Sequence, residues 1–172
     1  QTEDLVILIH GWNQAEYVNR FDASYYDDNH DMPEVVLHDR LKEALEGTSW
    51  DFLPYHWEQD AATGDLGLLN VLEPATWGEH GTEAAEIGHQ HGLNLGELLG
   101  CRTPNLKRVH FIAHSAGTWI ARAAAKILAS DPTIEKIQIT LLDPFIPGVL
   151  DGTVPATSML GKQYIEELID IT

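Results

Sequence analysis

The chain has 172 residues, of which 44% are hydrophobic, and a formal net charge of −17. This size and composition are typical of one globular domain with its own core, and no apolar run approaches the roughly 18 residues of a transmembrane helix. The carboxylate excess argues against nucleic acid and anionic lipid as partners, because both are polyanions. The charge also favours a secreted or extracellular protein. The single cysteine, Cys101, allows no disulfide within the chain.

The first predicted element is a strand at residues 5–9, LVILI. It is apolar on both faces, which is typical of a central parallel strand covered by helices. A turn, His10-Gly11-Trp12-Asn13, follows it, and residues 14–32 are expected to be a loop. The acidic stretch Asp27–Asp31 in this loop offers oxygen ligands for calcium, but its spacing is not that of an EF-hand. We therefore expect no cofactor.

A helix and an edge strand are predicted next. Residues 33–46 have leucines at helical spacing, a proline in the first turn and Gly47 as a stop. Residues 50–57, WDFLPYHW, predict a strand. Pro54 cannot donate a hydrogen bond to a neighbouring strand, so this strand is expected at an edge or a bulge.

The middle of the chain predicts a loop at residues 58–80, with room for a short helix, and a helix at 82–99. Three glycines repeat every four residues along this helix, at Gly88, Gly92 and Gly96. Such a repeat lowers helix propensity, and it indicates that another backbone comes close on that side. The inward face is expected to hold Ala84, Ile87, Gly88, His91, Leu95 and Leu98. His89 and His91 lie two apart and point to different sides, so with His80 they make a poor zinc site.

The last third alternates strand and helix: a strand at 108–113, a helix at 116–128, a strand at 135–142 and, after a proline- and glycine-rich loop, a helix at 160–171. Strand-helix alternation predicts a doubly wound, mainly parallel α/β sheet with helices on both faces.

Between the strand at 108–113 and its helix lies a very tight turn, Ala113-His114-Ser115-Ala116-Gly117. The residues beside Ser115 are small because the helix must cross close over the strand it leaves. A turn of this kind holds a serine hydroxyl exposed above the sheet. The alternative is that Ser115 only fills the turn or caps the helix.

Three features come directly after strands: His10-Gly11-Trp12, His114-Ser115 and Asp143. Ligands of open parallel sheets bind at the carboxyl ends of the strands. The residues that could carry chemistry are therefore expected at one edge.

The same segments resemble the α/β-hydrolases, and within them the pancreatic-type lipases and their bacterial relatives. VILIHGW resembles the first strand with its oxyanion loop, and IAHSAG resembles the nucleophile elbow, with Ala113 where the first glycine usually stands. ITLLDPFIP resembles the segment in which pancreatic-type lipases place the acid. The resemblance spans residues 5 to 147 and implies a single α/β-hydrolase core domain over 1–172.

The resemblance implies specific roles. Ser115 would be the nucleophile of an ester or lipid hydrolase, and Asp143 the acid that orients the base, with Asp151 as the alternative. The backbone N–H groups of Ala116 and Trp12 would form the oxyanion hole, and the site would be lined by His10, Gly11 and His114. The implied strand order is 50–57, 5–9, 109–113, 136–142, which places Pro54 in an edge strand.

The expected catalytic histidine is absent from these residues. The family's triad runs serine, acid, histidine along the chain, and none of the nine histidines follows Ser115. The simplest interpretation is an N-terminal part of a longer hydrolase that is inactive alone, with the histidine on a C-terminal part of the same protein. The alternatives are that an upstream histidine serves, or that the chain is a non-catalytic binding domain of this fold.

Overall fold

The computed structural model describes residues 2–11, 33–57, 60 and 74–146, with side chains left out at 33–34 and 74–82. Four strands form one sheet in which all neighbours are parallel, in the order β2-β1-β3-β4. Their bounds are β1 Asp4–Ile9, β2 Trp50–Tyr55, β3 Arg108–His114 and β4 Lys136–Leu142. The predicted α/β class and strand order are both confirmed. Within the described strands β2 is an edge, as Pro54 requires.

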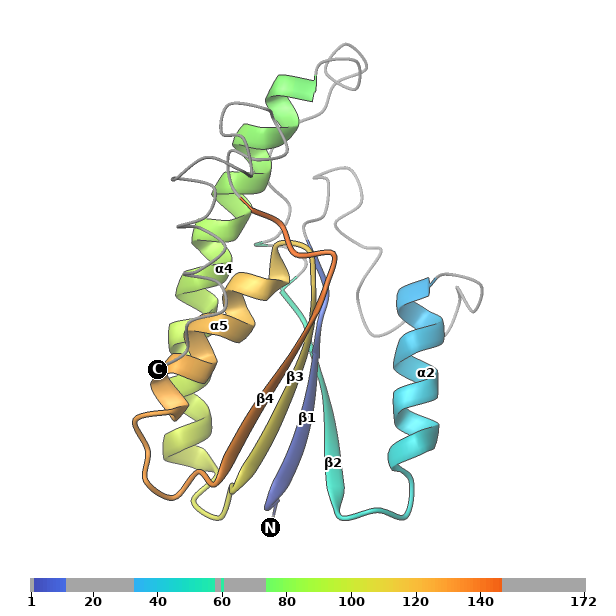
Figure 1. Cartoon of the computed structure of the whole chain (residues 1–172), viewed down its shortest axis with the longest axis vertical. Helices are drawn as coiled ribbons and strands as arrows, with labels where there is room; N and C mark the ends of the chain where they lie inside the picture. Colours follow the sequence, from blue (N-terminus) through green and yellow to red (C-terminus); the bar gives the residue numbers. More distant parts are fainter. Residues whose placement is uncertain (1, 12–32, 58–59, 61–73, 147–172) are drawn as a thin grey trace.

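Helices cover both faces of this sheet (Figure 1). Helices α4, Pro74–Arg102, and α5, Gly117–Leu128, pack together on one face over the larger apolar core. Helix α2, Pro33–Leu45, lies on the other face, where its predicted leucine stripe packs against Val6, Leu8 and Ile112. Gly47 follows α2 with φ 75°, the left-handed conformation that ends helices.

Helix α4 is longer than the sequence predicted. The expectation of a loop through residue 80 is wrong for 74–80, which belong to α4. Pro74 is a favourable first residue of a helix, but Gly78 and Gly81 just after it reduce the propensity and hide the signal. The predicted inward face is also wrong at Leu98, which is 56% exposed, whereas Leu99 is buried. Predicted helix 160–171 lies outside the described residues.

The glycine repeat of α4 is the surface that packs on α5. A Cβ on Gly92 would collide with the carbonyl oxygen of Ile120 and lie 2.7 Å from the Cβ of Ala123. A Cβ on Gly96 would lie 2.9 Å from the carbonyl oxygen of Ala124. The expected close approach of a second backbone is therefore confirmed, and α5 is its source.

An ion pair joins the two central strands at the opposite end of the sheet from the serine. Asp4 is buried and accepts hydrogen bonds from Nε and Nη2 of Arg108 and, at 2.9 Å, from the Ser49 hydroxyl. The Arg108 guanidinium also lies 5.3 Å from the centre of the Trp50 ring. Its hydrogen bonds hold the pKa of Asp4 below the ordinary value of 3.8, against the opposing effect of burial.

Alanine substitutions along α4 should have opposite effects at two glycines. Gly92→Ala should lower the free energy of unfolding by about 1–3 kcal/mol, because the new methyl group forces α4 away from α5. Gly100→Ala is the matched control, because a Cβ there meets nothing within 4 Å. Alanine is the better helix former, so this substitution should raise the free energy of unfolding by about 0.5–1 kcal/mol. Urea unfolding of both variants measures the difference, and equal effects would contradict the packing described.

The Asp4–Arg108 pair should make stability depend on pH in acid. A folded-state pKa below 3.8 means that the pair stabilises the fold above the unfolded-state value, and that this contribution is lost as the pH falls through the folded-state value. Asp4→Asn should therefore be less stable than the parent at pH 7, with the difference shrinking below about pH 4. Urea midpoints between pH 2.5 and 7 measure it, and a difference that stays constant would refute the coupling.

Candidate active site

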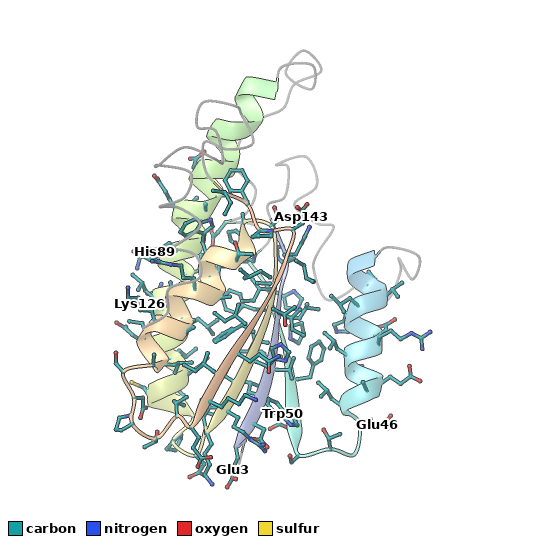
Figure 2. All side chains as sticks on the ribbon, in the orientation of Figure 1. Glu3, Glu46, Trp50, His89, Lys126 and Asp143 are labelled. Carbon is teal, nitrogen blue, oxygen red and sulfur yellow. The ribbon has the colours of Figure 1, made fainter. Side chains whose placement is uncertain are left out.

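The predicted site residues gather at the carboxyl ends of the strands. His10 and Gly11 follow β1, and Asp143 follows β4. The β3–β4 register pairs His114 with Leu142, and Ser115 N–H continues the ladder by donating to the Leu142 carbonyl at 3.0 Å. Ser115 and Asp143 therefore come directly after the ends of the neighbouring strands β3 and β4. Figure 2 shows Asp143 at this end of the sheet and Glu3 at the other.

Ser115 has the strained backbone that the sequence predicted for this turn. Its φ is 49°, in the left-handed region, which costs a residue with a Cβ roughly 1–2 kcal/mol. Surrounding bonds hold it there: its carbonyl oxygen accepts from the N–H of Thr118 at 3.1 Å and from the Thr118 hydroxyl at 2.7 Å. Thr118 is fully buried, and its contribution was not recognised from the sequence. The sequence feature that could have indicated this role is the hydroxyl side chain three residues after the serine.

Two glycines let the end of β1 lie directly against this turn. A Cβ on Gly117 would collide with the His10 carbonyl oxygen and lie 2.9 Å from Cγ2 of Ile9. A Cβ on Gly11 would lie 2.7 Å from the Cβ of Ser115. Of the small residues expected around the serine, Gly117 is therefore needed, but for a contact with β1 and not with the strand that the helix leaves. It brings the predicted oxyanion loop next to the predicted nucleophile.

The first turn of α5 supplies the one described candidate for an oxyanion donor. Ala116 precedes the helix without a side-chain cap, and within the described ranges its N–H has no acceptor. Uncapped N–H groups at a helix start attract negative charge. The second predicted donor, the N–H of Trp12, lies outside the described residues, as do Asp151 and the calcium candidate Asp27–Asp31.

Asp143 also has a left-handed backbone, with φ 45°, and its side chain is exposed. The segment after it is fastened at two points, one in the serine turn and one in α5. Phe145 N–H donates to the Ser115 carbonyl at 3.3 Å, and the indole N–H of Trp119 in α5 donates to the Phe145 carbonyl at 3.0 Å. The segment after Asp143 is therefore positioned in part by the turn that holds Ser115.

His10 is part of the scaffold of the site. It is 4% exposed, and its Nδ1–H donates to the Gly11 carbonyl at 2.8 Å. Trp57 binds it twice: the backbone N–H of Trp57 approaches His10 Nε2 at 3.4 Å, and its indole N–H donates to the His10 carbonyl at 2.9 Å. These partners assign the Nδ1–H tautomer. Sequence reasoning missed Trp57, since only the register of β1 against β2 brings the two residues together.

Three other described histidines form hydrogen bonds that do not involve Ser115 or Asp143. His38 on α2 bonds Asp39, and His110 in the middle of β3 bonds the Thr140 hydroxyl, with burial lowering the pKa of His110. His91 on α4 is half-buried and bonds both Tyr55 and Asp60, so it is satisfied, as expected, though not fully buried. Among the described histidines, His10, His56 and His114 lie at the carboxyl ends of strands, on the same edge as the serine.

Neither a metal site nor a membrane span is found in the described part of the chain. No three His, Cys, Asp or Glu side chains gather there in a way that could hold an ion. No helix among those described combines the length and apolar character that crossing a bilayer needs. Comparison with protein-family models, curated proteins and solved structures gives no match for this chain.

The strain at Ser115 predicts a difference in stability between two substitutions at this position. Ser115→Gly should unfold with a free energy about 1 kcal/mol higher than that of Ser115→Ala, because glycine adopts φ 49° at little cost and alanine does not. Chemical denaturation of the two proteins side by side measures this. A glycine variant that is no more stable than the alanine variant would contradict a strained serine.

Proposed function

We propose that this chain carries the nucleophile, acid and oxyanion elements of a serine hydrolase of the α/β-hydrolase type that cleaves carboxylic esters. The observation that carries the proposal is the left-handed Ser115, held between a parallel strand and a helix with small residues on both sides. Packing alone gives no reason to keep a residue with a Cβ in that conformation, where glycine is favoured. A nucleophile that must be exposed above the sheet gives such a reason.

The proposed chemistry proceeds in two halves. Ser115 Oγ attacks the ester carbonyl while its proton passes to a base, and the tetrahedral oxyanion accepts hydrogen bonds from the N–H groups of Ala116 and Trp12. Collapse expels the alcohol, which takes that proton, and leaves an acyl-serine. Water, deprotonated by the same base, attacks this ester and releases the carboxylic acid and free Ser115. Asp143 orients the base and stabilises it while it is positively charged.

The base in this proposal comes from outside residues 1–172. The triad of this type runs serine, acid, histidine along the chain, and none of the nine histidines follows Ser115. Two of the histidines at the serine's edge are also poorly placed: His10 is engaged by Gly11 and Trp57, and His114 immediately precedes the nucleophile. A histidine on a C-terminal part of the same protein would complete the triad over Asp143. The substrate is a small ester or a lipid, and no cofactor is needed for this reaction.

A non-catalytic binding domain is the competing function, and the absence of a histidine after Ser115 is the observation that favours it. The two functions differ in one measurable property. An enzyme has an activated serine that a fluorophosphonate labels, and a domain that keeps the turn only for packing does not.

Fluorophosphonate labelling of the full-length protein should modify Ser115 and be abolished by Ser115→Ala. Asp143→Asn should slow it by about 10³–10⁴-fold, because the base loses its orienting carboxylate. Intact-mass spectrometry with peptide mapping measures both effects. Equal labelling after Ser115→Ala, or none in the parent, would refute the hydrolase.

A truncated protein tests the origin of the base. Residues 1–172 alone should label far more slowly than the full-length protein, since no group in them takes the serine proton. Fast turnover by the truncated protein would instead assign the base to an upstream histidine.

A further inference from the structure

Thr118 lies fully buried in the first turn of α5 and donates twice to the carbonyl oxygen of Ser115. Its hydroxyl lies 2.7 Å and its N–H 3.1 Å from that oxygen. We propose that Thr118 is a positioning residue that orients the proposed oxyanion donor, the N–H of Ala116. This inference rests on the hydrolase function proposed above, and it goes beyond the part that Thr118 plays in holding the strained serine.

The first step concerns the peptide group between Ser115 and Ala116. The Ser115 carbonyl and the Ala116 N–H belong to this one group, and a trans peptide group is planar with its C=O and N–H pointing in opposite directions. Whatever fixes the direction of the carbonyl therefore fixes the direction of the donor. Threonine hydroxyls often bond a carbonyl of the preceding turn in helices. Thr118 differs because the carbonyl that it binds shares a peptide group with the proposed donor.

The second step concerns how firmly the Ser115 carbonyl is held. The N–H of Phe145 is its third donor, at 3.3 Å, and the Phe145 carbonyl in turn accepts from the Trp119 indole at 3.0 Å. A backbone carbonyl has two lone pairs, so three donors saturate it. The Thr118 hydroxyl forms the shortest of the three hydrogen bonds, and its burial keeps water from replacing it. Removing this hydroxyl therefore weakens the hold on the peptide group where it is strongest.

The third step concerns the strength of the donor. Hydrogen bonds that a carbonyl accepts polarise its peptide group, and they make the N–H on the other side a better donor. The Ala116 N–H has no acceptor within the described ranges, so an oxyanion can serve as its acceptor. The negative charge of the transition state gains more from an oriented and polarised N–H than a neutral ester carbonyl does. Thr118 should therefore affect kcat and leave KM nearly unchanged.

The test compares four variants of the full-length protein. Thr118→Val removes the hydroxyl and keeps the shape of the side chain, whereas Thr118→Ser keeps the hydroxyl. Thr118→Ala also removes the hydroxyl, and because alanine is the better helix former it decides the question where the valine variant folds poorly. Thr48→Val is the matched control, since the Thr48 hydroxyl also donates at 2.7 Å to the carbonyl three residues before it, that of Leu45. Thr48 lies two residues before Trp50, which Figure 2 shows at the other end of the sheet from Asp143.

Three readouts separate positioning from structure: kcat and KM on a p-nitrophenyl ester, the rate of Ser115 labelling by the fluorophosphonate, and the inhibition constant of a trifluoromethyl ketone that forms a tetrahedral adduct. Thr118→Val and Thr118→Ala should lose about 10- to 50-fold in kcat and in labelling rate, with KM within about two-fold, because the donor is misdirected but not removed. The inhibition constant should rise in parallel with the loss in kcat/KM. Thr118→Ser and Thr48→Val should stay within about three-fold of the parent in all three readouts.

Failure of the positioning role and failure of the hydrolase give different results. If the parent labels at Ser115 and the folded valine or alanine variant matches it in kcat and inhibition, the positioning role of Thr118 is wrong and the hydrolase stands. The role is equally overturned if only KM rises, if Thr118→Ser loses as much as Thr118→Val, or if Thr48→Val shows the same loss. If the parent shows no labelling at Ser115, the hydrolase falls, and this inference falls with it.

Discussion

The rest of the structure depends on a close contact between two backbone segments, the end of β1 and the start of α5. Gly11 lies against the Cβ of Ser115, and Gly117 lies against the His10 carbonyl, so neither position has room for a side chain. Helix α5 can leave β3 within two residues only because these surfaces are bare. The same contact places an uncapped helix start, a strained serine and the loop after β1 together at one edge of the sheet.

Other elements are arranged to hold that contact closed. Helix α4 presses on α5 through Gly92 and Gly96, and Trp57 fills the corner where Gly88 nears Ala116. On the other side, the segment after Asp143 is tied back to the Ser115 carbonyl and to Trp119. The turn at Ser115 is therefore supported from the directions of α4, β2 and β4. Support of this kind is what lets a residue persist in a costly conformation.

Much of this arrangement could be predicted because short sequence patterns determine it. The apolar run at 5–9, the small residues around Ser115 and the four-residue glycine spacing each reflect a constraint that acts over a few residues. The extent of α4 could not be predicted, because Gly78 and Gly81 weaken a helix that tertiary packing sustains. The roles of Trp57 and Thr118 depend on which strand lies next to which, and one sequence does not show register. The proposed base could not be predicted from local patterns, because none of the nine histidines follows Ser115.

The sheet order has a consequence for how the chain reaches this state. β1 is central, yet its partner β3 is made about a hundred residues later: Asp4 and Arg108 are 104 positions apart. Closing so long a loop is slow, and β1 with β2 alone is a two-stranded ribbon of marginal stability. While the chain is synthesised, LVILI therefore lacks its β3 partner and is prone to aggregation. The net charge of −17 repels neighbouring chains during that interval, so the acidity of the protein protects its folding as well as its solubility.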